Sequence, residues 1–255
     1  MTKVGILPSG VEIEYQKLTG KHQRLLTEKG SNSNEFIASF IVRLGSDTNI
    51  TADKVQKMIA PDRKMALILA RQYALNNNPI MRFNITYKTE SGKKQIVPEE
   101  LNLDELGGFP VTKPKMLVGD ILVEADYKEL SEIKKDFECI LPESGMKVRW
   151  YMLDGLGEAW ATKLAKNKRS SHTAIEMRFP VEIKKDSKGN DLPIKIDTAK
   201  LDNLSFIDIE YLREYIYEIE GRVDSEYMYS HPDTGEDQTI DLLTVTTFYF
   251  PSGKI

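Results

Sequence analysis

Two distant stretches of the chain share one pattern. The first reads "LPSGVEIEYQKLTGKHQRLLTEK" at residues 7–29, and the second reads "LPESGMKVRWYMLDGLGEAWATK" at residues 141–163. When Gly10 is set on Gly145, Leu18 also falls on Leu153. A Pro-Gly turn followed by alternating apolar and polar residues is typical of a half-buried strand that begins at a tight turn. A chain that repeats such local signals is predicted to fold into two related units.

The later part of each unit strengthens this prediction. Both halves continue through helix-like segments to a hairpin-like segment, whose turn glycines are Gly92 and Gly235. A repeat of about 130 residues indicates two domains rather than a solenoid, whose units are much shorter. The sequence therefore predicts a first domain at 1–106, a connector at 107–137 and a second domain at 138–255.

The periodicities within each unit predict an α+β fold. Val11, Ile13 and Tyr15 alternate on one face of a predicted strand. Helices are expected over "TADKVQKMI" (51–59), "APDRKMALILARQYAL" (60–75), "GEAWATKLAKNK" (157–168) and "IDIEYLREYIYEIEG" (207–221), and hairpins over 81–101 and 226–250. The connector is expected to carry one short strand, "MLVGDILVE", and a helical turn, whereas 170–205 offers two short extended segments around a charged turn.

Composition excludes several kinds of partner. Apolar residues make up 40% and the net charge is −4, which is typical of a globular protein without a dedicated nucleic-acid surface. The basic segment 163–169 lacks interleaved aromatic residues and is interpreted as a solvated helix end or loop. The longest wholly apolar run, 65–70, is too short to span a bilayer, and no secretory segment follows Met1. A cytosolic protein without a membrane partner is expected, with the single Cys139 as a small core residue.

The residue patterns predict no catalytic, cofactor or metal site. The three histidines are scattered, and none forms a metal-binding pair or accompanies a nucleophile motif. No glycine-rich nucleotide loop follows a strand, and "GLGEAW" at 155–160 lacks the glycine spacing of one. The chain is therefore predicted to be non-enzymatic, with no cofactor and no small-molecule substrate.

Two segments are instead candidates for binding another protein. Three consecutive aromatic residues near the end of the chain cannot all enter one core from a single strand, so either a partner covers one face or the monomer covers both. The apolar strand of the connector has no evident partner in either unit. Exposed strand edges of this kind are natural docking elements. The candidate protein-binding residues are Phe248, Tyr249, Phe250, Leu117, Ile121 and Val123.

The order of these motifs resembles a known family. Leu-Pro-Ser-Gly and an alternating strand, then Leu-Thr-Gly with Leu-Leu four residues on, then "IVRLG" and a helix led by Asp-Arg resemble the T4-type baseplate hub and tail-assembly proteins of contractile-tailed bacteriophages. The resemblance covers most of 5–104 and, more faintly, 138–250. Relatives often carry a Cys-Pro-x-Cys-Gly knuckle at the hairpin turns, but the turns at 88–92 and 231–235 contain no cysteine here. No zinc is therefore expected at either turn, because the thiolate ligands are missing.

The resemblance implies a non-enzymatic structural or assembly protein of a contractile-tail baseplate hub. Its partners would be other tail or baseplate proteins, and it would act in the cytoplasm of the bacterial host and then reside in the virion tail. A transient tail-assembly chaperone that leaves the particle, and a regulatory binding module unrelated to phage, remain alternatives. Two related units would offer two related surfaces, which suits a protein that bridges neighbours in an assembly.

Overall fold

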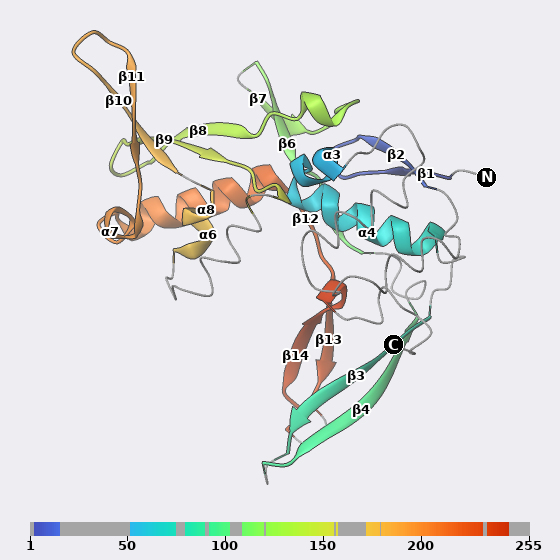
Figure 1. The fold of residues 1–255 in the computed structure, drawn as a ribbon. Coiled ribbons are helices and arrows are strands. Elements are labelled where there is room, and N and C mark those ends of the chain that lie inside the picture. Colours follow the sequence, from blue (N-terminus) through green and yellow to red (C-terminus); the bar gives the residue numbers. More distant parts are fainter. Residues whose placement is uncertain are drawn as a thin grey trace.

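The structure is a computed structural model, and it describes residues 3–15, 52–74, 80–89, 92–102, 109–119, 121–155, 157, 172–178, 180–231 and 234–244. It combines helices with small antiparallel sheets, so the predicted α+β class is confirmed (Figure 1). Buried apolar side chains from both halves of the sequence form one contiguous cluster that runs from Leu7 to Leu243.

The chain begins with a hairpin made of β1 (Lys3–Ile6) and β2 (Glu12–Tyr15). The Leu-Pro-Ser-Gly turn closes it: the Leu7 N–H donates to the carbonyl of Val11, and the Gly10 N–H donates to the carbonyl of Leu7, both at 2.9 Å. Val11, Ile13 and Tyr15 are buried, as the alternation predicted. The first strand of this hairpin was not foreseen, because residues 3–6 carry no alternation of their own.

Two helices follow in the described part of the chain, α3 (Ala52–Lys57) and α4 (Ala60–Ala74). Both lie within predicted helical segments. The first hairpin packs on α4, where the Tyr15 hydroxyl donates to the backbone carbonyl of Ala66 at 3.2 Å. The helix leads into the predicted hairpin of β3 (Ile80–Lys88) and β4 (Lys94–Asn102), paired in register from Ile80–Asn102 to Lys88–Lys94.

The middle segment is more structured than predicted. It holds β5 (Val111–Thr112), β6 (Lys115–Val118), β7 (Ile121–Glu124) and a 3-10 turn, η1 (Leu130–Glu132). The helical turn was expected, but the single strand "MLVGDILVE" was wrong, because β6 and β7 form a hairpin. Gly119 allows the reversal: its φ of +63° lies in the left-handed region that glycine adopts without strain.

The second half contains a four-stranded antiparallel sheet in the order β11-β10-β9-β8. Its strands are β8 (Asp136–Ile140), β9 (Lys147–Tyr151), β10 (Val181–Lys185) and β11 (Asp191–Lys195), and the accompanying helices are α6 (Thr173–Glu176), α7 (Thr198–Leu201) and α8 (Phe206–Glu220). Phe137 stacks on Trp150 at 5.3 Å between ring centroids, and Tyr215 of α8 meets Trp150 edge-on at 6.3 Å. Helix α8 therefore covers one face of this sheet. The helix expected over 157–168 lies outside the described residues, apart from Gly157.

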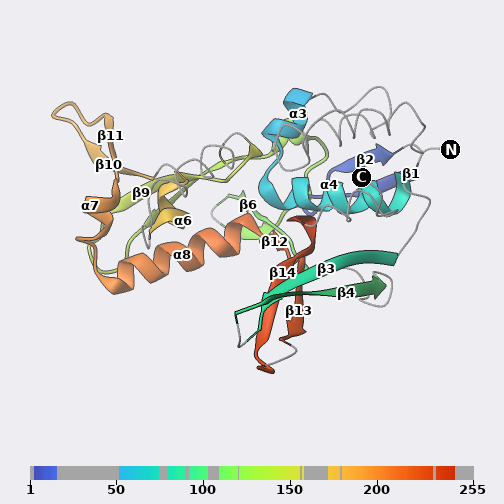
Figure 2. The same cartoon turned by 60° about the horizontal axis from the view of Figure 1, so that its bottom comes forward.

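The end of the described chain returns to the first half. Strand β12 (Arg222–Val223) pairs with β5, and β13 (Glu226–Ser230) and β14 (Asp237–Asp241) form the second predicted hairpin. The prediction extended this hairpin to residue 250, which was wrong at 242–244, because β14 ends at Asp241 and a 3-10 turn, η2 (Leu242–Thr244), follows. The two long hairpins lie together, with Phe83 edge-on to Tyr227 at 6.1 Å and Tyr87 edge-on to His231 at 4.6 Å. Figures 1 and 2 show them side by side, apart from the helices.

Candidate protein-binding surfaces

The β6–β7 hairpin has two apolar faces: one packs Leu117 and Leu122 against the core, and the other packs Met116 there but exposes its remaining apolar side chains. Residues directly opposite in an antiparallel pair share a face, and faces alternate along each strand. Leu117 pairs with Leu122, and both are half-buried against the core. Val118 pairs with Ile121 on the other face, where Val118 is 55% and Ile121 is 68% exposed. Val123 lies on this second face and is 38% exposed.

We call Val118, Ile121 and Val123 the hairpin face. Two of the connector residues predicted from the sequence, Ile121 and Val123, belong to it, whereas Leu117 points to the opposite side. Val118 was missed because the segment was predicted to be a single strand. In the hairpin, Val118 lies opposite Ile121 and therefore shares its face. Strand β7 pairs with β6 alone among the described strands, so its outer edge carries backbone groups to which another strand can be added.

The hairpin face is held in place by contacts at the base of the hairpin. Lys115 forms an ion pair with Glu218 of α8, and the N–H of Ala125 donates to the carbonyl of Pro114 at 2.8 Å. The hairpin is thereby anchored to the long helix of the second half, while its turn points away from the body (Figure 1). An apolar surface on an anchored element loses little conformational entropy when a partner covers it.

The aromatic residues Phe248, Tyr249 and Phe250 lie outside the described residues. Their role in binding stays a prediction.

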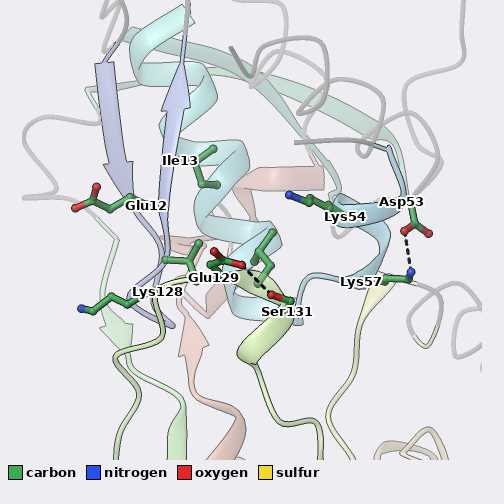
Figure 3. Close-up of a pocket in the computed structure, with 10 residues that line it drawn as sticks. Glu12, Ile13, Asp53, Lys54, Lys57, Lys128, Glu129 and Ser131 are labelled. Carbon is green, nitrogen blue, oxygen red and sulfur yellow. Dashed lines mark hydrogen bonds and ion pairs between the residues drawn. The ribbon is translucent and has the colours of Figure 1, made fainter. Parts of the chain in front are cut away.

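A hollow of about 600 Å³ lies between β2, α3 and η1 (Figure 3). Two of its charged side chains, Lys57 and Asp53, form an ion pair at 2.7 Å, and Glu129 accepts a hydrogen bond from the Ser131 hydroxyl at 3.1 Å. The lining balances three basic and three acidic residues, so it offers no net charge to a ligand. The lining residues are Val11, Glu12, Ile13, Asp53, Lys54, Lys57, Lys128, Glu129, Leu130 and Ser131.

Two aspartates fasten the Leu-Pro turns to the two long helices. Each is the third residue of its helix, where the N-terminal end of the helix dipole favours a carboxylate. Asp62 of α4 accepts the N–H of Ser9 at 2.9 Å. Asp208 of α8 accepts the N–H groups of Glu143 and Ser144 at 2.9 and 3.0 Å. The same device thus joins turn and helix in both halves.

The electrostatics of the two aspartates differ. Burial raises the pKa of Asp62 to about 6, against the lowering effect of the hydrogen bonding from Ser9. Its Oδ2 atom and the Ser9 Oγ atom are both buried with no hydrogen-bond partner among the described residues. Burial also acts on Asp208, but the N–H groups of Glu143 and Ser144 outweigh it and hold the pKa of that carboxyl below its usual value.

Predictions about the cysteine, metal sites and membrane spans also came from the sequence, and the structure bears on them only for the residues that it describes. Cys139 is buried, and burial raises the pKa of its thiol to about 12, which makes the thiolate scarce at neutral pH. Within the described residues, no three His, Cys, Asp or Glu side chains are grouped so as to share a metal ion. Nor does the described part of the chain contain a helix long and apolar enough to cross a membrane.

Comparison of the chain with protein-family models, with curated proteins and with solved structures finds no match in any of the three.

Proposed function

We propose that this chain is a non-enzymatic structural or assembly protein of a contractile-tail baseplate hub, and that it binds a neighbouring tail protein through the hairpin face. The observation that carries the proposal is the exposed apolar surface of Val118, Ile121 and Val123 on an anchored hairpin, in which β7 pairs with no described strand other than β6. The assignment to a contractile-tail baseplate is supported by the resemblance of the Leu-Pro-Ser-Gly turn, its strand and the Asp-Arg-led helix to tail-assembly proteins.

The magnitude of the apolar contribution suits an assembly contact. Burying a fully exposed Val or Ile side chain stabilises a complex by about 1.5–3 kcal/mol. The exposed parts of the three side chains would together contribute roughly 3 kcal/mol. Backbone hydrogen bonds along β7 would add specificity, because strand addition fixes both register and direction. Such a surface is small enough to leave the free protein soluble.

The test is genetic complementation in a bacterium that produces the particles. A strain lacking the gene would receive the wild-type chain, the double variant Val118→Asp and Ile121→Asp, or the control Leu192→Asp, which changes an exposed apolar residue on β11. We expect the double variant to fold but to yield few complete tails, and the control to assemble normally. Full assembly by the double variant would overturn the assignment of the hairpin face.

Mass spectrometry of purified particles then separates two roles. A stoichiometric amount of the chain in mature tails supports a structural subunit of the hub. Its absence from tails whose assembly depends on it supports a chaperone that leaves the particle. Complete tails in the strain that lacks the gene would overturn the proposed function itself.

A further inference from the structure

The two long hairpins, β3–β4 and β13–β14, project together from the body of the molecule, and we call them the arm (Figures 1 and 2). Their inner faces pack on one another, because Phe83 meets Tyr227 edge-on at 6.1 Å and Tyr87 meets His231 edge-on at 4.6 Å. Side chains alternate along a strand, so the neighbours of these aromatic residues point outwards, on opposite sides of the arm. The arm therefore has two outer faces, one from each hairpin.

The outer face of β3–β4 is basic. Arg82 forms an ion pair with Glu100 at 2.6 Å, whereas Lys88 lies directly opposite Lys94, and neither lysine forms an ion pair with a described residue. Ile96 lies beside this lysine pair and is 62% exposed. We call this surface the basic face. All of its residues are exposed: Arg82, Asn84, Thr86, Lys88, Lys94, Ile96, Pro98 and Glu100.

The pairing of Lys88 with Lys94 differs from the other charged pairs in the described sheets. Like charges directly opposite one another destabilise an antiparallel pair. Every other basic residue that lies opposite a charged residue in these sheets faces an acid: Arg82 faces Glu100, Lys115 faces Glu124, Arg149 faces Glu138 and Lys185 faces Asp191. An acidic surface placed over the two lysines would remove their repulsion, so the basic face favours an acidic partner.

The outer face of β13–β14 has the opposite charge. Glu226 lies directly opposite Asp241, and Asp237 lies opposite Ser230 at the other end of the hairpin. Met228 lies between them and is 62% exposed. The two strands place no basic residue on this side. We call this surface the acidic face. Its residues are Glu226, Met228, Ser230, Asp237, Thr239 and Asp241, of which all but the half-buried Asp241 are exposed.

The two faces are complementary in chemistry and in size. Each is two strands wide, and each presents one large exposed apolar side chain, Ile96 or Met228, among charges of a single predominant sign. Because they lie on opposite sides of one arm, they cannot meet within one chain. A nucleic acid fits the basic face less well, since that face has no exposed aromatic ring on which a base could stack and the chain has a net charge of −4.

We propose that the basic face of one copy of this chain binds the acidic face of a second copy. The contact is heterologous, so it repeats from copy to copy and produces a ring when the rotation closes and a filament when it does not. Each face is only about 10 Å wide, which is less than a standard interface of about 800 Å² per partner requires. The association is therefore weak and sensitive to salt. The proposal is independent of the function proposed above, because it uses neither the hairpin face nor the assignment to a tail.

Sedimentation velocity of the full chain, at concentrations up to about 1 mM, provides the test. We expect the wild type to associate at low ionic strength and to dissociate in about 0.5 M salt, where charges are screened. The basic-face variant Lys88→Glu with Lys94→Glu and the acidic-face variant Glu226→Lys with Asp237→Lys should each weaken association by more than about tenfold, because like charges then meet across the contact. Far-ultraviolet circular dichroism checks that both variants remain folded.

An equimolar mixture of the two variants tests the pairing of the faces directly. The first variant has two acidic faces and the second has two basic faces, so the mixture should associate although each variant alone does not. The matched control is Lys188→Glu with Lys195→Glu, which makes the same change of charge at exposed positions of the β10–β11 hairpin, away from the arm (Figure 1). This control should associate as the wild type does.

Several results would overturn the proposal. They are a wild type that stays monomeric at low ionic strength over the whole concentration range, association that neither variant weakens, a control that weakens it as much as the variants do, and a mixture that fails to associate. Association that disappears on nuclease treatment would assign the basic face to a nucleic acid and would overturn the proposal as well.

Discussion

The contrast between Asp62 and Asp208 leads to the most direct test of the fold. Asp62→Asn removes a buried charge but keeps an acceptor oxygen for the Ser9 N–H, and its amide can donate to the orphaned Ser9 Oγ. Asp208→Asn instead replaces one of two accepting oxygens by a donor that would face an N–H group. The two substitutions are chemically identical, yet the first should stabilise the protein at neutral pH and the second should destabilise it.

The size of the Asp62 effect follows from its pKa. A rise from the ordinary value of 3.8 to about 6 is about two units, which corresponds to about 3 kcal/mol of penalty on the ionised form. Because the folded-state pKa is raised, the favourable contribution of the protonated group is fully present below the unfolded pKa of 3.8 and is lost as the pH rises through about 6. Above that pH, Asp62→Asn should therefore raise the free energy of unfolding by about 1–3 kcal/mol.

Asp208 has the opposite sign. Its folded-state pKa is lowered, so its contribution is present above the unfolded value of 3.8 and is lost as the pH falls through the folded pKa. Loss of a charge-assisted hydrogen bond should make Asp208→Asn less stable than the wild type by about 1.5–3 kcal/mol at neutral pH, and this deficit should shrink in acid.

Urea unfolding followed by circular dichroism, at about pH 4.5 and about pH 7.5 and constant ionic strength, measures both effects. The gain from Asp62→Asn should be largest at the higher pH and smaller at the lower one. If Asp62→Asn destabilises the protein at the higher pH as much as Asp208→Asn does, the burial of an uncompensated carboxylate at Asp62 is refuted.

Three further outcomes are expected from single sites. Gly221→Ala should lower the free energy of unfolding by at least about 2 kcal/mol more than Gly189→Ala in a urea titration. Both glycines have positive φ, but only at Gly221 would the added Cβ meet backbone, 2.4 Å from the nitrogen of Pro114. Arg178→Met should cost about 3 kcal/mol in the same assay, since it leaves the mostly buried Glu220 carboxylate without the guanidinium that contacts it at 2.6 and 2.7 Å. Cys139 should resist an aromatic disulfide reagent in the native protein and react once after denaturation; rapid native labelling would contradict its burial.

Local periodicity was enough to predict much of the secondary structure. The helices over 60–75 and 207–221 and the hairpin with Gly92 in its turn are recovered nearly to the residue, because each depends on neighbours within a few positions. The hairpin with Gly235 in its turn was found, but its second strand ends at Asp241 and not near residue 250 as predicted. The hairpin of β6 and β7 was predicted as one strand, because apolar residues continue through both strands and only Gly119 and Asp120 separate them.

Tertiary contacts could not be predicted in the same way. The hydrogen bond from Ser9 to Asp62 joins residues 53 positions apart, and the bond from Ser144 to Asp208 spans 64 positions. No local pattern distinguishes these aspartates from other acidic residues at helix starts. The opposite exposures of Leu117 and Val118 were hidden for a related reason, since alternation separates two faces but does not say which one the core occupies. The duplication itself stays a prediction. It is supported by three features found in both halves: the Leu-Pro turn, the long helix, and the aspartate of that helix that binds the turn.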